Sequence, residues 1–202
     1  MAPKVAIVIY SMFGHIARLA EAVKSGVEAA GGQATIFQIP ETLPDNVLQL
    51  LHAKPKPAYP IIDAESLTGY DAFLFGIPTR YGNFPGQWKA FWDTTGGIWA
   101  KGGLAGKFVS VFVSTSTLGG GQETTAANAL STFVHHGLIF VPLGYARTFA
   151  QLTNVDEVHG GSPWGAGTLA AADNSRQPSA LELELGKIQG QQFWEIVSKY
   201  NF

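Results

Sequence analysis

The feature that most constrains the fold is the pairing of buried apolar runs with amphipathic helix patterns along the chain. The first run, Val5 to Tyr10, is continuously apolar and rich in β-branched residues, which is typical of a strand covered on both faces. After it, apolar residues return at intervals of three and four from Ile16 to Val27, which predicts a helix. Gly31 and Gly32 then mark the end of that helix.

Four further apolar runs predict strands, and three further segments predict helices. The strands fall at 34–39, 71–77, 108–113 and 138–143, and the helices at 87–93, 123–136 and 180–200. Strands that alternate with helices form a parallel sheet with helices on both faces. We therefore predict one α/β domain over residues 1–202, built on a flavodoxin-like doubly wound sheet of five strands.

Two inserted segments, 41–66 and 145–178, exceed what a minimal domain of this kind needs. The first carries four prolines and the second is rich in glycine and asparagine. Connections of this length usually carry function or an interface. Charged residues make up only 14% of the chain and there are five tryptophans, so we expect a cofactor or partner subunits to cover much of the surface.

The composition also argues against several classes of protein. There is no run of basic residues and the net charge is −2, so nucleic acid is not expected as a partner. Without cysteine there is no disulfide, thiolate metal site or cysteine nucleophile, and the histidines show no metal-ligand spacing. The run at 5–10 is far shorter than the roughly 20 residues of a membrane span, and no signal peptide is visible. A cytoplasmic location is therefore expected.

Three loops are the candidate site, because ligands of open α/β sheets bind at the carboxyl ends of the strands. They follow the first, third and fourth predicted strands and are rich in hydroxyl groups and glycine. Their residues are Ser11, Met12, Phe13, Gly14, His15 and Ile16; Pro78, Thr79, Arg80, Tyr81, Gly82 and Asn83; and Ser114, Thr115, Ser116, Thr117, Leu118 and Gly119. All three loops should meet at one edge of the sheet.

The first loop has the character of a phosphate site. It runs directly into a helix N-terminus, where free N–H groups and the macrodipole favour an anion. It contains no Lys or Arg, which argues against a nucleotide triphosphate and suits a single phosphate held by amides and Ser11. The other two loops can flank a flat ring, and Phe13, Tyr81 and Trp99 can stack near it.

Simpler interpretations compete for several of these residues. Ser11 can be only a helix cap, and the run 114–117 only a turn. Phe13 and Trp99 can be core or interface aromatics, and a histidine at 135 or 136 can simply complement a helix dipole. Gly165–Ala170 matches a dinucleotide fingerprint in spacing, but no predicted strand precedes it. Three polar loops at three expected positions nevertheless favour a binding site.

Seven segments along essentially the whole chain resemble those of one known family, in one register. They are Tyr10–Ile16, Pro78–Asn83, Thr94–Trp99, Gly119–Glu123, His135–Gly137, Gly160–Gly165 and Ser175–Ser179. The sequence resembles the WrbA family of flavodoxin-like NAD(P)H:quinone oxidoreductases, which includes fungal benzoquinone reductases. In two places the sequence departs from the family pattern. Phe13 stands where the family often has tyrosine, and Leu118 is an extra residue in the third loop.

The resemblance implies an FMN-dependent enzyme that takes hydride from NADH or NADPH. It would reduce benzoquinone-type quinones by two electrons in a ping-pong order, as a homotetramer built as a dimer of dimers. All the residues of the three loops would bind FMN, with 11–16 on its phosphate. His135 would lie beside the flavin as a source of protons, while Phe13 and Trp99 would contact the substrates. Two rival functions remain open at this point: a flavodoxin-type electron carrier, and an FMN-binding regulatory or scaffold protein.

Overall fold

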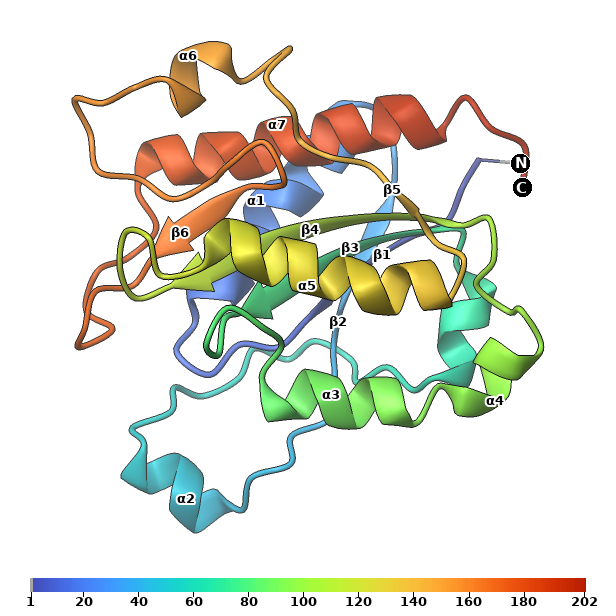
Figure 1. The fold of residues 1–202 in the computed structure, drawn as a ribbon, viewed down its shortest axis with the longest axis horizontal. Helices are drawn as coiled ribbons and strands as arrows, with labels where there is room; N and C mark the ends of the chain where they lie inside the picture. Colours follow the sequence, from blue (N-terminus) through green and yellow to red (C-terminus); the bar gives the residue numbers. More distant parts are fainter. Residues whose placement is uncertain (1) are drawn as a thin grey trace.

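A parallel sheet forms the centre of the molecule, as the computed structural model of residues 2–202 shows (Figure 1). Its strands are β1 (Val5–Ile9), β2 (Ala34–Gln38), β3 (Ala72–Pro78), β4 (Phe108–Thr115), β5 (Ile139–Phe140) and β6 (Gly167–Leu169). Five of them lie in the order β2-β1-β3-β4-β5, and all of the pairs are parallel. This order confirms the predicted flavodoxin-like doubly wound sheet.

The far edge of the sheet differs in detail from the prediction. The apolar run at 138–143 forms only the two-residue strand β5, since Pro142 lacks the N–H that would continue a ladder. Beyond it, the unpredicted strand β6 pairs with the carboxyl end of β4. At three residues β6 is too short to show a periodic pattern, so its sequence gave no sign of a strand.

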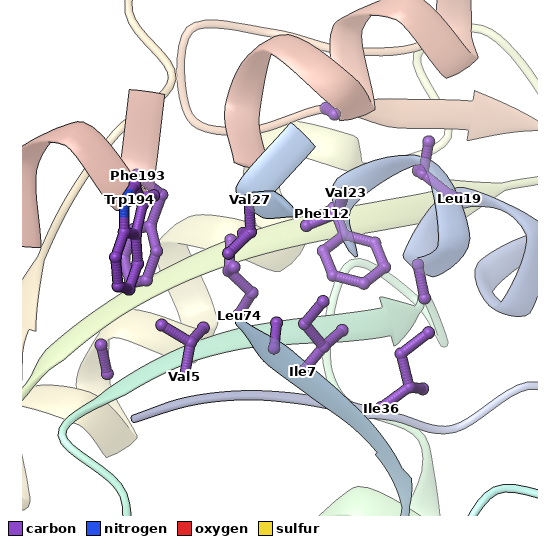
Figure 2. Packing of buried hydrophobic residues seen from close by; sticks show 14 of the residues in the cluster. Val5, Ile7, Leu19, Val23, Val27, Ile36, Leu74, Phe112, Phe193 and Trp194 are labelled. Atoms are coloured by element: carbon purple, nitrogen blue, oxygen red, sulfur yellow. The ribbon is translucent and has the colours of Figure 1, made fainter. Parts of the chain in front are cut away.

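Helices α1 (His15–Ala29) and α7 (Ala180–Val197) cover one face of the sheet. Figure 2 shows side chains of the strands, such as Ile7 and Phe112, packing beneath these two helices. The helices touch through their backbones: a Cβ atom on Gly26 would lie 1.9 Å from the Lys187 carbonyl oxygen, and one on Gly190 equally close to that of Val23. Glycine at both positions is therefore what allows the close approach.

Helices α3 (Gly86–Asp93) and α5 (Gln122–His135) cover the opposite face. An aromatic cluster fills the space beneath them, in which the rings of Trp88, Trp92 and Phe133 each lie 5.4 Å from that of Phe75. The core of the domain thus has two halves, one on each face of the sheet.

The remaining helices are short and belong to the connections. They are α2 (Asp45–Leu50), α4 (Gly96–Ala100), α6 (Phe149–Leu152) and a 3₁₀ helix, η1, over Glu65–Gly69. Helix α2 lies in the first inserted segment, η1 begins at the end of that segment, and α6 lies in the second. None of the helices in residues 2–202 is long and apolar enough to cross a bilayer.

Candidate functional site

A cavity of about 430 Å³ opens at the carboxyl edge of the sheet, within the size range of about 300–1,000 Å³ that is typical of ligand pockets. The three predicted loops and both inserted segments line it. The predicted residues at its wall are Ser11, Met12, Phe13, His15, Ile16, Pro78, Thr79, Arg80, Ser114, Thr115 and Ser116. The structure therefore brings most of the predicted site residues together.

The first loop presents a set of free backbone donors to this cavity. Gly14 is the N-cap of α1, has a φ of 91°, and no side chain caps the helix. Within residues 2–202, the N–H groups of Phe13, Gly14, His15 and Ile16 have no hydrogen-bond acceptor. Four free amides at a helix N-terminus form a cradle for an anion.

Ser11 is not the simple helix cap of the competing interpretation. The N-cap position belongs to Gly14, and Ser11 Oγ only accepts a long hydrogen bond of 3.4 Å from the Ala17 N–H. The hydroxyl is buried and lines the cavity. It is therefore free to contribute to the same anion site as the amides.

A cation that the loop itself lacks comes from the first inserted segment. The Lys54 N–H donates to the Met12 carbonyl, and Lys54 Cδ would lie 3.7 Å from a Cβ atom on Gly14. Among the described residues no carboxylate forms an ion pair with Lys54. Its forty-residue separation from the loop leaves no local sequence signal for this placement.

The second loop is a tight hairpin turn that carries an exposed aromatic residue. Arg80 and Asn83 exchange two backbone hydrogen bonds, and both Tyr81 (φ 55°) and Gly82 (φ 74°) are left-handed. This is the geometry of a type I′ turn. Tyr81 therefore projects fully into solvent, outside the cavity wall.

Arg80 brings a positive charge to the cavity. Its guanidinium donates to the Thr79 carbonyl at 2.8 Å, and no described carboxylate pairs with it. An unneutralised arginine at the wall of a cavity favours electron-rich or anionic groups of a ligand.

The second and third loops are fastened to each other. The Thr79 N–H donates to the Ser114 carbonyl at 2.9 Å, and the hydroxyls of Thr79 and Thr125 lie 2.7 Å apart. The Asn128 side chain on α5 donates to the Gly82 carbonyl at 2.7 Å. The two loops therefore form one rigid side of the cavity.

The later part of the third loop turns away from this cavity. Thr117, Leu118 and Gly119 line a second cavity of about 330 Å³, together with residues such as His159. Leu118, the extra residue of the resemblance, is largely exposed. The FMN role predicted for these three residues stays a prediction.

A polar cluster around Glu41 lies next to the cavity, whose wall includes Gln87. The hydroxyl of buried Tyr10 donates to Glu41 at 3.0 Å, and Lys56 and Gln87 also donate to this carboxylate. Burial opposes ionisation of Glu41, but Lys56 and the Leu43 and Thr42 amides outweigh it, so the pKa of Glu41 lies below its ordinary value. For Tyr10, burial and the Glu41 charge raise the pKa.

His15 links the first loop to the second inserted segment. The ring is buried, and Nε2 donates to the Arg176 carbonyl oxygen at 2.7 Å. Burial holds the pKa of His15 below its ordinary value, so the ring is neutral at neutral pH and carries its proton on Nε2. His15 therefore acts as a hydrogen-bonding bridge and not as a cation.

Two predicted residues, His135 and Trp99, are not brought to the cavity of their own chain. The Trp99 indole donates to the His135 carbonyl at 2.8 Å, so they lie together at the C-terminal end of α5. That helix has 14 residues, and at 1.5 Å per residue it places them roughly 20 Å from its start beside the third loop. Figure 1 shows this end of α5 and helix α4 away from the carboxyl edge.

The structure adds cavity residues that the sequence analysis did not name. They come from the two inserted segments and from α3, and they are Leu43, Leu51, Gln87, Ala170, Ala172 and Asn174. Each is placed by contacts between parts of the chain that are distant in sequence, so no motif predicts them.

The residues present fit a flavin mononucleotide. Four amides without acceptors and the Ser11 hydroxyl match one phosphate, and the cavity beside them is lined by hydroxyl groups and by Phe13. Fold and site together define a flavodoxin-like protein with an FMN-type site.

Comparison with known families agrees with this class. Residues 4–150 match the FMN_red family, described as NADPH-dependent FMN reductase, and the chain belongs to this family. The match confirms two predictions: that the protein is an FMN-dependent oxidoreductase, and that it is one of the flavodoxin-like reductases.

Individual relatives give the same picture. The chain is 67% identical over 199 residues to the NAD(P)H quinone oxidoreductase PST3 of Candida albicans, covering 98% of this chain and 100% of the relative. It is 64% identical to protoplast secreted protein 2 of Saccharomyces cerevisiae, with 98% and 100% coverage. The WrbA-like flavodoxin structure from Agrobacterium tumefaciens superimposes with a TM-score of 0.67 at 22% identity, covering 98% of this chain and 99% of that one. This structural likeness confirms the fold.

Proposed function

We propose that the protein is an FMN-dependent NAD(P)H:quinone oxidoreductase that reduces benzoquinone-type quinones to hydroquinones by two electrons. The observation that carries the proposal is the anion cradle of free amides at Phe13–Ile16, which opens into a cavity of about 430 Å³. The name of the Candida albicans relative, NAD(P)H quinone oxidoreductase, supports the choice of substrates.

In this proposal FMN, when bound, supplies the two-electron redox chemistry, and the chain supplies binding and orientation. The first loop holds the phosphate, with Lys54 beside it. The joined second and third loops present Arg80 and the hydroxyls of Thr79 and Ser114 to the ring. Phe13 offers an apolar surface against which nicotinamide and quinone can stack in turn.

A single cavity that serves both substrates favours a ping-pong order. Initial rates measured at several fixed quinone concentrations, with NADH or NADPH varied, should give parallel double-reciprocal lines. Intersecting lines would contradict the shared cavity. Failure of both nicotinamide nucleotides to bleach the flavin spectrum would contradict the enzyme and favour an electron carrier.

We further propose that the protein works as a homotetramer and that His135 and Trp99 serve the flavin of a neighbouring copy. Within one chain they lie at the wrong end of α5, so only a second copy can bring them to a cavity. The exposed apolar side chains of Trp99, Val134 and Ile139 (54%, 71% and 46% exposed) support an interface at that end.

Light scattering of the FMN-loaded protein tests this assembly, and a monomer would overturn it. In a tetramer, His135→Ala should slow quinone reduction, because the variant lacks the side chain that is proposed to supply protons. Mixed assemblies of H135A with a variant defective in FMN binding should regain activity if His135 acts across the interface. Unchanged turnover of H135A at every pH would remove the proposed role in proton supply.

A further inference from the structure

An ion pair with a fully buried carboxylate joins Arg176, at the end of the segment 170–176, to Glu182 of α7. Glu182 on α7 has no exposed surface, and its carboxylate accepts hydrogen bonds from several surrounding donors. They are the N–H groups of Gly160, Leu169 and Ser179, the Thr168 hydroxyl and the Arg176 guanidinium. The hydrogen bonds of a single buried carboxylate therefore connect strand β6, its flanking loops and the start of α7.

Arg176 connects this carboxylate to the cavity. Its Nη1 lies 3.0 and 2.9 Å from the two oxygens of Glu182 and also donates to the Leu169 carbonyl, while Nη2 donates to the Val158 carbonyl. Its own carbonyl oxygen, on the other side, accepts the hydrogen bond from His15. The side chain of Arg176 is thus fixed by Glu182, and its backbone is fixed against the phosphate loop.

The segment held in this way forms one wall of the cavity. Ala170, Ala172 and Asn174 line it together with Ser11 and His15. No described residue forms a hydrogen bond with the Asn174 side chain, so its amide is available to a ligand. The Arg176 N–H closes the segment by donating to the Ala170 carbonyl at 3.1 Å.

The backbone of this wall enters the left-handed region at two residues. Ala171 has a φ of 64° and Asn174 a φ of 60°, a region that residues with a Cβ atom rarely adopt. Such conformations persist where surrounding contacts determine them, and they gather at ligand sites. The Glu182–Arg176 pair and the hydrogen bond from His15 hold the end of this segment at Arg176.

We propose that residues 170–176 are a fourth wall of the flavin site that closes on the phosphate end of the cofactor, and that Glu182 is the residue that positions it. Glu182 acts through Arg176. It holds the Arg176 guanidinium in place, and the Arg176 carbonyl accepts the hydrogen bond from His15 in the cradle. The proposal rests on the proposed function only as far as FMN binding, since it requires no quinone turnover. The quantity that tests it is the difference in affinity between FMN and the same flavin without its phosphate group.

Riboflavin is the probe that isolates this effect, because it has the ring and ribityl chain of FMN but no phosphate. We expect Glu182→Gln to raise the Kd of FMN at least about tenfold and that of riboflavin less than about threefold. Both constants are measured on the cofactor-free protein by quenching of flavin fluorescence. The amide of the variant cannot satisfy all five donors, so the wall loosens while the ring side of the cavity stays intact.

Gln189 provides a matched control on the same helix, two turns further along. It is also buried, and it forms hydrogen bonds with Ala166, Ser110 and Val111 away from the cradle. Gln189→Met should lower stability but leave the FMN-to-riboflavin ratio of Kd values unchanged. If E182Q weakens FMN and riboflavin equally, or weakens neither, the positioning role is wrong.

A second measurement needs no variant. In hydrogen exchange of the wild-type protein, saturating FMN should protect peptides that cover 170–176, and saturating riboflavin should not. Equal protection by both ligands, or by neither, would overturn the proposal even if E182Q fails to fold. Equal wild-type affinity for FMN and riboflavin would overturn it too, whereas absence of quinone turnover with normal FMN binding would overturn only the proposed function.

Discussion

The two inserted segments both reach the cavity, but they are anchored with very different strength. Helices α2 and α6, one in each segment, bury no residue. In 41–66, one tie is Glu41, whose side chain is 17% exposed and whose partner Lys56 is 26% exposed. In 145–178, the corresponding tie is the Arg176–Glu182 pair, in which Arg176 is likewise 26% exposed but Glu182 is 0% exposed. The same chemistry, a glutamate with one cation and several amides, is therefore used once near the surface and once in the interior.

The difference teaches how burial decides what an ion pair contributes. An ion pair near solvent adds little to the free energy of unfolding, because water already stabilises each charge. A buried pair, compared with apolar residues in its place, also adds little. Removal of a buried partner alone is costly, however, because it leaves the groups around it without their counterion or hydrogen-bond acceptor. The second segment should therefore be a firm wall of the site and the first a looser one.

The largest contrast should come from the same substitution at both glutamates. Glu182→Gln should lower the free energy of unfolding by about 3 to 5 kcal/mol, because a neutral amide replaces a fully buried carboxylate that accepts hydrogen bonds from five groups. Urea denaturation of the cofactor-free protein measures this loss. A loss below about 1 kcal/mol would show that water reaches the pair and that the contrast between the segments is false.

Glu41→Gln should lower the free energy of unfolding by only about 1 kcal/mol, with a distinct pH dependence. The pKa of Glu41 is lowered in the folded state from its ordinary 4.5. Its contribution is therefore complete above that ordinary value and is lost as the pH falls through the folded pKa. The stability difference between wild type and E41Q should shrink as the pH falls below the ordinary value of 4.5; a difference that stays constant would contradict the role of the charge.

This contrast between the segments also marks the limit of what the sequence predicts. The strand at 5–9 and the cradle at 13–16 follow from local patterns, because periodicity and a helix N-terminus are properties of neighbouring residues. The spacing of Ser179 and Glu182 is a capping box, which the structure contains, and the sequence alone offers no more than this local role. Arg176 and Thr168 reach Glu182 only through the tertiary fold.

The same limit explains the outcome for His135 and Trp99. The resemblance placed them beside the flavin, but which end of a helix faces which cavity depends on how the chain folds and assembles. Lys54 and Asn174 show the converse case: Asn174 lines the cavity and Lys54 lies beside Gly14 of the cradle, although no motif contains either residue. Loops next to strand ends were predictable, whereas residues delivered by long insertions were not.

The cations of the two segments should differ in their effect on FMN binding. Lys54 lies beside the cradle without a carboxylate partner in the described chain, whereas Glu182 already neutralises Arg176. Lys54→Met should raise the Kd of FMN about three- to fivefold, equivalent to up to about 1 kcal/mol, and should make the affinity less dependent on salt. Riboflavin affinity is the control and should stay the same. An unchanged salt dependence would mean that Lys54 does not face the phosphate.

The smallest effects should come from one strained residue in each segment. His52 (φ 53°) follows the end of α2, where Ala53 N–H donates to the Leu48 carbonyl, a position usually taken by glycine. Ala171 (φ 64°) lies in the proposed fourth wall. Either His52→Gly or Ala171→Gly should raise the free energy of unfolding by about 0.5 to 1 kcal/mol. Glycine relieves the strain of the left-handed conformation, but part of this gain is offset by the greater conformational entropy of glycine in the unfolded chain.

FMN binding then separates the two variants. H52G should leave the Kd of FMN unchanged, because α2 is only loosely joined to the site. A171G should raise it about twofold, since a more flexible wall must be ordered when the cofactor binds. Titration of both variants with FMN under one set of conditions measures the difference. If the two variants bind FMN equally well, strain at Ala171 does not serve the site, and the two segments differ in stability alone.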